Sequence, residues 1–172
     1  MKPSGPRRMA VHPSLQVAYV ILDWAGQIVS YRFGTDGMLR EPKTISIFPE
    51  GKAPKAVTGV MTAAELEVTA DGKTLYASTR TPDCQSIAIL RVNSSGQPTL
   101  VANEEASGLL KGPRHFMLTH DNRHLLVANQ DNDTLLVLAV NAATGLLTLL
   151  GAATPTRVKK PNAIAFGSLQ ME

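Results

Sequence analysis

The stretch KGPRHFMLTHDNRHLLVANQDNDTLLVLAVNAATGLL, from Lys111 to Leu147, has a counterpart near the start of the chain. That counterpart is SGPRRMAVHPSLQVAYVILDWAGQIVSYRFGTDGML, from Ser4 to Leu39. Both begin with Gly-Pro-Arg and continue with an apolar run, a polar turn, two more apolar runs and a turn that contains glycine. A third copy, AAELEVTADGKTLYASTRTPDCQSIAILRVNSSGQPTLV, lies between them. A unit repeated three times in one chain indicates an architecture of stacked copies.

The three copies align without gaps through their first two apolar runs, and the aligned positions form sets. These sets are Arg7, Ala64 and Arg114; Tyr19, Tyr76 and Leu126; and Asp23, Arg80 and Gln130. After the third copy, KKPNAIAF begins the pattern again. The repeats therefore cover residues 5–50, 62–104 and 112–154, and a trailing strand is expected at 161–166.

Each copy is predicted to form four short strands, because runs rich in Val, Leu and Thr alternate with polar turns. In the last copy these strands are expected at 115–119, 124–129, 134–140 and 147–153. In the middle copy, ADGK is expected to form a tight hairpin turn, since Asp-Gly readily supplies a positive φ. The stretch VMTAAELE, residues 60–67, resembles a short helix, but its alignment with the other copies makes it the entry to a strand.

Four-stranded units of about 40–50 residues are typical of β-propeller blades. The sequence therefore predicts an all-β fold, a partial β-propeller with three antiparallel blades plus the first strand of another, in one domain over residues 1–172. Closed propellers have about four to eight blades, so two sides are expected to be open. The start just before a blade suggests a truncated or split gene, or a piece of a longer chain. An open sandwich or another all-β fold is the alternative.

Composition indicates a soluble, globular protein of the reducing cytoplasm. Mean hydropathy is −0.01, and no run approaches the ~18 apolar residues that span a membrane. The basic N-terminus lacks an uninterrupted apolar segment, so no signal peptide is expected. Cys84 is the single cysteine, which excludes an internal disulfide. The net charge is +3, and the densest basic cluster, RVKKP at 157–161, is interpreted as a solvated loop. The expected partner is therefore an anionic small molecule, not nucleic acid or a membrane.

Alternating strand directions make a prediction about where the chemistry lies. The loop that enters the first strand of a blade and the loop after the second strand fall at the same end. The residues expected to share that end are Arg7, Arg8, Glu65, Arg114 and His115, together with Asp23, Arg80 and Gln130. Loops that enter innermost strands lie closest to the axis, where propellers commonly place their sites.

These residue types suit the binding and hydrolysis of an anion. Several arginines around a concave mouth bind carboxylate or phosphate by paired hydrogen bonds. Asp23 could act as a general base on water, and His115 could titrate near neutral pH and transfer protons. The alternatives are that Gly-Pro is a plain turn with a solvated Arg7, and that His115 is a structural residue at the start of a strand.

The remaining signals carry less chemistry. The sequence has no Gly-rich phosphate loop, no nucleophile elbow and no recognised metal-ligand spacing, so no metal is expected. Cys84 is expected to be a surface thiol of no consequence in a loop. His12 and His120 are expected at the opposite end, as structural residues. Trp24 is expected either to line the mouth or, in the preferred interpretation, to pack between blades.

Three segments resemble one known family: GPRRMAVHPSLQVAYVILD, TADGKTLYASTRT and GPRHFMLTHDNRHLLVANQDNDTLLVLAVNAATGLL. They are similar to the lactonase family of seven-bladed β-propellers, which includes bacterial propeller-type 6-phosphogluconolactonases and fungal carboxy-muconate cyclases. The resemblance covers nearly the whole chain. It implies the C-terminal half of such a propeller, namely the last three blades and the closing strand.

The resemblance also implies a site in which arginines, a Glu and a His gather on the axial face. The first Gly-Pro-Arg arginine of the family falls on Arg7, its Glu falls on Asp23, and the arginine after the Tyr-Ala strand falls on Arg80. Two departures stand out. Asp23 is one methylene shorter than Glu, and Arg8 stands where the family often has His. The family's catalytic His would lie in blades that precede Met1.

The implied reaction is hydrolysis of a sugar lactone, most simply 6-phosphogluconolactone in the pentose phosphate pathway. Arg7, Arg80, Arg114 and Gln130 would bind the substrate, Asp23 would activate water, and no metal or organic cofactor is required. One alternative is a carboxy-muconate cyclase-type lyase. Another is a non-catalytic propeller fragment that acts as a scaffold, associating with itself or with a second propeller fragment.

Overall fold

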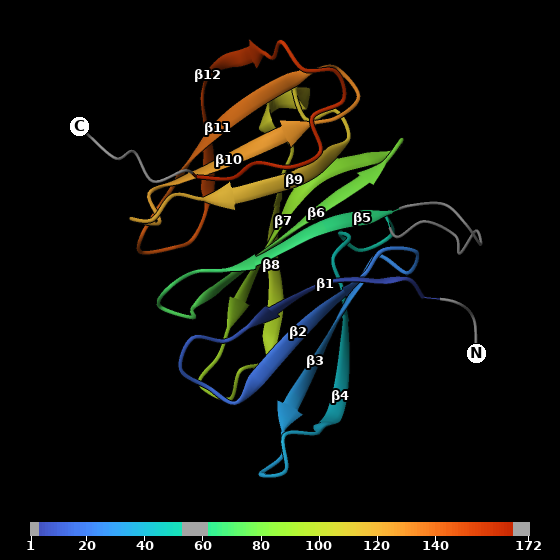
Figure 1. The fold of residues 1–172 in the computed structure, drawn as a ribbon, viewed down its shortest axis with the longest axis vertical. Helices are drawn as coiled ribbons and strands as arrows, with labels where there is room; N and C mark the ends of the chain where they lie inside the picture. Colours follow the sequence, from blue (N-terminus) through green and yellow to red (C-terminus); the bar gives the residue numbers. More distant parts are fainter. Residues whose placement is uncertain (1–3, 53–61, 167–172) are drawn as a thin grey trace.

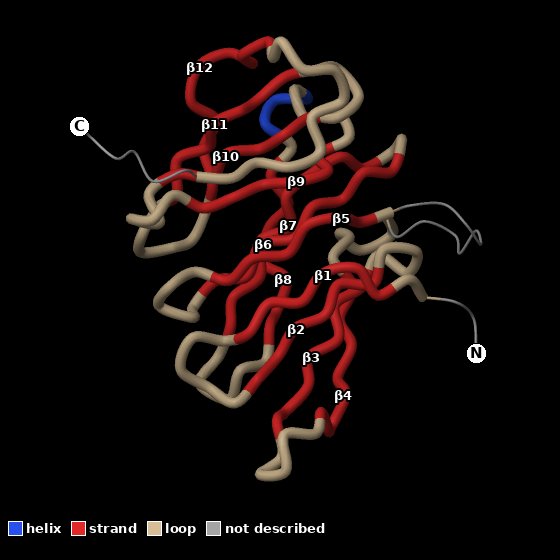
Figure 2. The backbone as a smooth tube through the Cα atoms, viewed as in Figure 1, coloured by secondary structure: helices blue, strands red, loops and turns tan. Residues whose placement is uncertain are grey.

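The computed structural model describes residues 4–52 and 62–166. They form three four-stranded antiparallel sheets, arranged one after another along the molecule (Figures 1 and 2). The first sheet contains β1 (Pro6–Val11), β2 (Val17–Leu22), β3 (Gln27–Phe33) and β4 (Leu39–Ser46). The second contains β5 (Ala63–Val68), β6 (Thr74–Thr81), β7 (Cys84–Val92) and β8 (Pro98–Glu104). The third contains β9 (Pro113–Leu118), β10 (His124–Asn129), β11 (Thr134–Val140) and β12 (Leu147–Pro155).

Each sheet is a simple meander in which consecutive strands pair, as the repeats predicted. The first strands of the three sheets, β1, β5 and β9, lie side by side, with β5 contacting both of the others. The described helical structure is a single short 3-10 turn, Ala106–Gly108, and no described helix has both the length and the apolar character to cross a membrane. This is the arrangement of propeller blades around an axis.

The middle sheet is buried on both faces. Strand β6 is buried at every position except Arg80, whereas the outer strand β4 is mostly exposed. One apolar cluster joins the first and second sheets and includes Tyr19, Ile28, Leu75 and Leu90. A second cluster joins the second and third sheets and includes Tyr76, Ile87, Phe116 and Leu125. Packing between blades thus supplies the cores that a single blade lacks.

The aligned tyrosines link each blade to the next. The hydroxyl of Tyr19 donates to the carbonyl of Gly96 (2.9 Å), and that of Tyr76 donates to the carbonyl of Gly145 (2.8 Å). Both phenol rings are completely buried, so each hydroxyl needs a partner. In the third copy Leu126 takes this position and makes no such link.

The four strands predicted for the last copy are confirmed within about two residues at each end. The stretch VMTAAELE enters a strand, as preferred, from Ala63 onward; residues 60 and 61 lie outside the described residues. The strand expected at 161–166 is wrong. Residues 161–166 pair with no strand among the described residues, and the inner strand of a blade forms its ladder only with the second strand of that blade.

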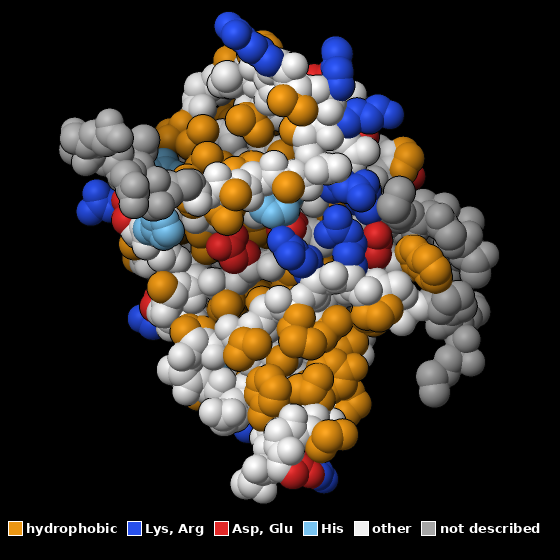
Figure 3. Space-filling model, in the orientation of Figure 1, with side chains coloured by type: hydrophobic (Ala, Val, Ile, Leu, Met, Phe, Trp, Pro, Cys, Tyr) orange, Lys and Arg blue, Asp and Glu red, His pale blue; other side chains and the backbone are white. Residues whose placement is uncertain are grey.

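The first sheet leaves an apolar face uncovered. Met9 and Val11 on β1 are each 53% exposed, and Met38 and Leu39 are exposed near its turn. Figure 3 shows hydrophobic side chains gathered over this sheet, while Lys, Arg and His side chains gather near the centre of the same view, over β1, β5 and β9. The charged centre is the region where sequence reasoning expected a site.

Candidate functional site

One hydrogen bond recurs in all three copies and gathers the predicted site at a single end of the blades. In each blade, a residue where the second strand ends donates its backbone N–H to a backbone carbonyl in the segment just before the first strand. These bonds join Asp23 to Gly5 (2.7 Å), Arg80 to Thr62 (3.0 Å) and Gln130 to Gly112 (3.0 Å). Gly5 and Gly112, the glycines of the two Gly-Pro-Arg turns, both have positive φ values, which glycine adopts readily. The expected common face is confirmed.

Asp23 is the centre of a buried polar cluster. Its side chain is largely buried, and Oδ1 accepts the backbone N–H groups of Thr62 (3.0 Å) and Ala63 (3.1 Å). Its Oδ2 accepts Nη2 of Arg80 at 3.1 Å and lies 3.9 Å from Nε of Arg7. Both carboxylate oxygens therefore have partners already. The carboxylate joins the first blade to the second and holds two arginines.

The two arginines are also fixed by backbone carbonyls of β5. Nη1 of Arg7 donates to the carbonyl of Ala64 (2.6 Å), and Nε of Arg80 donates to the carbonyl of Ala63 (3.0 Å). Burial lowers the pKa of Arg7, and the positive charge of Arg114 lowers it further. Burial also lowers the pKa of Arg80, with Asp23 opposing that effect. Guanidinium groups stay protonated at neutral pH nonetheless, so the cluster is a crowded positive field that an anion would relieve.

Arg114 and Gln130 form the equivalent pair in the third blade. Nη1 of Arg114 donates to Oε1 of Gln130 at 3.0 Å. Because the amide is neutral, this contact orients the guanidinium without balancing its charge. Arg114 consequently adds to the positive field around Arg7 and Arg80, as the pKa shifts of both show.

A second cluster adjoins the first and brings together Arg8, Glu65 and His115. Nε of Arg8 donates to Oε1 of Glu65 at 2.6 Å, and Nε2 of His115 lies 3.5 Å from Oε2 of Glu65. Nη2 of Arg8 lies 3.2 Å from the same His115 nitrogen. Burial lowers the pKa of His115, and Arg8 and Arg7 lower it as well, while Glu65 opposes them. The imidazole is therefore neutral at neutral pH and able to accept a proton.

Sequence reasoning placed Glu65 on this face but gave it no role. A signal was present in the repeat: Arg8, Glu65 and His115 follow directly after the aligned set of Arg7, Ala64 and Arg114. They are therefore equivalent positions of three copies, and equivalent positions meet at the axis. A hollow of about 390 Å³ opens beside them, lined by Arg7, Arg8, Glu65, His115, Asn162 and Ala163.

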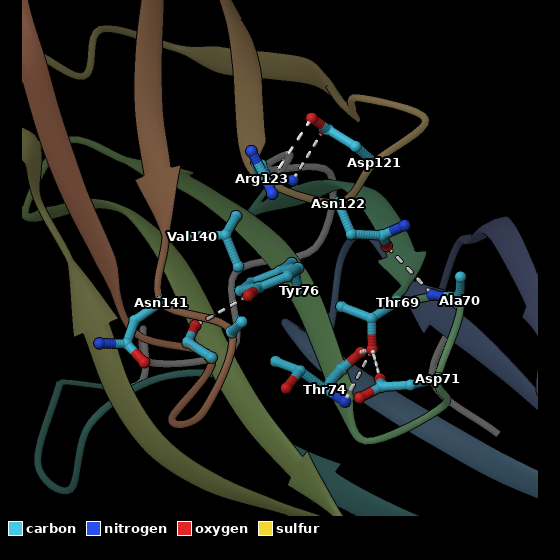
Figure 4. A pocket seen from close by; sticks show the side chains of 12 residues that line it. Thr69, Ala70, Asp71, Thr74, Tyr76, Asp121, Asn122, Arg123, Val140 and Asn141 are labelled. Atoms are coloured by element: carbon cyan, nitrogen blue, oxygen red, sulfur yellow. Dashed lines mark hydrogen bonds and ion pairs between the residues drawn. The ribbon is translucent and has the colours of Figure 1, made fainter.

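A different hollow, of about 270 Å³, lies at the opposite end of the second and third blades (Figure 4). Its polar groups already have partners: Thr69 donates to Asp71 within one turn (2.7 Å), and Asn122 of the third blade accepts the backbone N–H of Ala70 in the second (3.0 Å). Tyr76 on its wall is used by the link between blades. Because these polar groups already have partners, this hollow is a weaker candidate for a binding site than the arginine cluster.

The expected structural histidines behave differently from one another. His12 is buried, and its Nδ1 accepts the backbone N–H groups of Ser14 (3.2 Å) and Leu15 (3.0 Å), which confirms a structural role in the turn. His120 is exposed, with its ring 5.3 Å from that of Phe166. Neither belongs to the arginine cluster.

Two further expectations are wrong. Cys84 is a buried residue, not a surface thiol, because β7 begins at Cys84 and turns its side chain into the first core cluster. Its Sγ lies 3.6 Å from the hydroxyls of both Thr79 and Ser86. Trp24 does not pack between blades. Its ring lies against Gly5 of the same blade and is 38% exposed, because the turn after β2 carries it outward.

Over residues 4–52 and 62–166, no three His, Cys, Asp or Glu side chains come together in a way that could hold a metal ion. The polar groups at the axial end are instead four arginines, an amide, two carboxylates and one imidazole. Such a set binds anions through charge-assisted hydrogen bonds and can move a proton. The expectation that no metal or organic cofactor is required stays a prediction.

Fold and site together define a set of β-propeller blades with an arginine-rich polar cluster at one end. The chain belongs to the lactonase family, whose sequence model, described as "Lactonase, 7-bladed beta-propeller", matches residues 1–166.

Named relatives and a solved structure agree with this family. The chain is 29% identical to the 6-phosphogluconolactonase of Bacillus subtilis over 160 residues, 92% of this chain and 42% of the relative. It is 30% identical to that of Yersinia enterocolitica, over 86% of this chain and 42% of the relative. The solved periplasmic gluconolactonase PpgL of Pseudomonas aeruginosa superposes with a TM-score of 0.82 at 26% identity, covering 97% of this chain and 44% of that protein. The chain thus spans less than half the length of the relatives it matches.

Proposed function

We propose that this chain belongs to an enzyme that hydrolyses a sugar lactone, with 6-phosphogluconolactone of the pentose phosphate pathway as the substrate. The observation that carries the proposal is the meeting of Arg7, Arg80 and Arg114, from three separate blades, with Arg7 lining the hollow of about 390 Å³. A phosphorylated lactone presents a dianionic group and develops a second negative charge at its carbonyl oxygen during hydrolysis. Fixed guanidinium groups stabilise both. The names of the relatives support the same substrate class.

The reaction needs a base that the arginines do not supply. A water oxygen bonds to the lactone carbonyl carbon, its proton passes to the base, and the ring C–O bond breaks as the ring oxygen takes up a proton. Both oxygens of Asp23 already accept donors, so Asp23 is assigned to holding Arg7 and Arg80. His115, neutral and beside the hollow, is assigned as the base. This replaces the expectation that Asp23 activates water.

The test is the double variant Arg7→Ala/Arg80→Ala, with Arg91→Ala as the matched control. Arg91 is exposed and donates to the carbonyl of Thr144 (2.8 Å), far from the cluster in the fold. Loss of oxyanion donors costs about 10²–10³-fold in rate, so kcat/KM of the double variant should fall at least about 100-fold. Proton release from 6-phosphogluconolactone in weak buffer measures the rate, with the uncatalysed rate subtracted. Circular dichroism checks that the fold is retained.

A wild-type rate in the double variant would remove the arginines from the mechanism. A wild-type chain that neither hydrolyses the lactone nor binds 6-phosphogluconate by titration calorimetry would contradict the proposed function itself. A carboxy-muconate cyclase-type lyase is the second candidate, because the same arginines suit substrate carboxylates. Assay of both substrates on one preparation separates the two.

A non-catalytic role rests on a different observation, the uncovered face of the first sheet. Met9 and Val11 are each 53% exposed, and they lie on the face that another blade would cover in a closed ring. A second copy of this chain, or another propeller fragment, is the proposed covering partner. Light scattering at micromolar concentration tests this: a stable monomer of 18.4 kDa argues against it.

A cytoplasmic location is likewise a proposal, and the Pseudomonas relative is described as periplasmic.

A further inference from the structure

Glu65 on β5 has one carboxylate oxygen without a partner. The residue is 3% exposed. Its Oε1 accepts Nε of Arg8 (2.6 Å) and the backbone N–H of Leu66 (3.2 Å). Among the residues that the structure describes, its Oε2 is a buried oxygen that accepts no hydrogen bond. Leaving a buried acceptor unsatisfied costs about 1–3 kcal/mol or more for a charged group, so such an oxygen needs an explanation.

The nearest candidate donor is His115. Its Nε2 lies 3.5 Å from Oε2 of Glu65, slightly beyond an ordinary hydrogen bond. On the other side of the ring, Nδ1 accepts the backbone N–H of Ile164 at 3.3 Å. Because Nδ1 accepts a hydrogen bond there, a neutral His115 that keeps this bond carries its own proton on Nε2, on the side of Glu65.

The opposite tautomer satisfies fewer groups. With the proton on Nδ1, Nε2 could accept from Nη2 of Arg8 at 3.2 Å. That arrangement would set two donors, Nδ1–H and the N–H of Ile164, against each other, and would leave Oε2 of Glu65 unpaired. With the proton on Nε2, Nδ1 accepts the N–H of Ile164, and the Nε2 proton faces Oε2 of Glu65 at 3.5 Å. The one opposed contact is then Nη2 of Arg8, which meets that proton as a second donor, while Nε of Arg8 keeps its bond to Oε1 of Glu65. The second arrangement is therefore favoured.

We propose that Glu65 is a positioning residue of the lactonase site: its oxygen Oε2 accepts the Nε2 proton of His115 and so keeps the lone pair on Nδ1, where a water that displaces the N–H of Ile164 would give up its proton. This rests on the proposed function. The Nδ1 side of the ring faces residues 162–164, and Asn162 and Ala163 border the hollow of about 390 Å³. A water that takes the place of the Ile164 N–H would meet that lone pair directly.

The direct test is the tautomer of His115, read from long-range ¹H–¹⁵N correlations of the imidazole ring above neutral pH. The His115→Asn variant assigns its signals among the four histidines of the chain. In the wild type the proton should be on Nε2. In Glu65→Gln it should move wholly or partly to Nδ1, since the new amide can donate to Nε2. In Glu67→Gln it should stay on Nε2.

Glu67 is the matched control because it lies two residues along β5 and is also an acid. Its Oε2 accepts the backbone N–H of Leu118 (2.9 Å), and its carboxylate makes no hydrogen bond or ion pair with His115. General-base catalysis contributes about 10²–10⁴-fold, so loss of the correct tautomer should lower kcat at least about tenfold. KM for the lactone should change little, because the arginines still bind it. Glu67→Gln should leave kcat unchanged near pH 7.

The outcomes separate the proposal from the function on which it rests. A wild-type His115 with its proton on Nδ1 overturns the proposal whatever the activity, as does a tautomer that Glu65→Gln leaves unaltered. A tautomer that changes while kcat stays constant overturns the positioning role. If the tautomer changes as expected but the wild type turns over no lactone, the contact between Glu65 and His115 stands and the proposed function fails.

Discussion

Asp23 offers a sharp test of how the site is built, because two roles for it predict different consequences. If Asp23 is a base, its replacement should stop turnover and leave stability alone. If it joins the blades and holds the arginines, its replacement should cost stability. The pair of variants Asp23→Asn and Asp23→Ala separates these roles, since Asn keeps an acceptor at Oδ1 for Thr62 and Ala63 but replaces Oδ2 with an amide nitrogen that cannot accept from Arg80.

The contacts set the expected magnitudes. Asp23 and Arg80 each have side chains only 8% exposed, and removing one partner of a buried ion pair costs about 3–5 kcal/mol. Asp23→Ala also removes Oδ1 as an acceptor for the N–H groups of Thr62 and Ala63, but both still donate to the backbone carbonyl of residue 23 (3.1 and 3.2 Å), so this loss adds little. We expect Asp23→Ala to lower the free energy of unfolding by about 3–5 kcal/mol. Asp23→Asn should lower it by about 1.5–3 kcal/mol, the value of one hydrogen bond to a charged group.

Urea denaturation followed by circular dichroism measures both variants against wild type. Asp83→Ala serves as the control, because Asp83 is exposed in the loop before β7 and should change stability by less than about 0.5 kcal/mol. Affinity for 6-phosphogluconate should fall in both Asp23 variants as Arg7 and Arg80 lose their fixed positions. The reasoning fails if Asp23→Ala unfolds within about 0.5 kcal/mol of wild type.

Three further predictions concern the blades themselves. Tyr76→Phe should lower the free energy of unfolding by about 0.5–1.5 kcal/mol in urea denaturation, because the carbonyl of Gly145 loses its donor; an unchanged midpoint would contradict the link. Burial raises the pKa of Glu67 to about 7 from its ordinary value of 4.5, so the folded state binds the proton more tightly. The contribution of Glu67 to the free energy of unfolding is therefore full below pH 4.5 and is lost as pH rises towards about 7. Urea denaturation at a series of pH values should show this decrease in the wild type and a smaller decrease in Glu67→Gln. The buried Cys84 should react with a thiol reagent far more slowly in the folded protein than in urea, and equal rates would contradict its burial.

Much of the fold was predictable from sequence because its determinants are local. Alternating apolar residues and Asp-Gly or Asn-rich turns set strands and hairpins within about ten residues, and a meander joins neighbours in order. The repeat then gave the common end for Arg7, Asp23 and Arg80 without any tertiary information. The wrong predictions are those that depend on which strand or blade lies next to the residue in space. A strand at 161–166 needs a partner strand, and the burial of Cys84 depends on the first blade packing over β7.

The roles within the site were harder to predict, because side chains of different blades decide them. The repeat could place Asp23 at the rim, but only the coordinates show that Thr62 and Ala63 occupy one of its oxygens. Glu65 gave no local signal either. Its partners Arg8 and His115 are 57 residues before it and 50 residues after it. A comparison of equivalent positions across the copies would have found this set, since all three lie one residue after the Gly-Pro-Arg arginine position.

The divergence of those equivalent positions is what makes the site possible. Three identical copies of Gly-Pro-Arg-Arg would gather six guanidinium groups at one rim without the carboxylate of Glu65, and their repulsion and desolvation would oppose packing of the blades. In this chain the middle copy replaces the arginine pair with Ala64 and Glu65, which supply a carbonyl to Arg7 and a carboxylate to Arg8. The third copy places His115 at the position of Arg8, which removes a fixed charge and adds a group that can accept a proton. Repetition therefore determines where the side chains meet, and the differences between copies determine what they can do there.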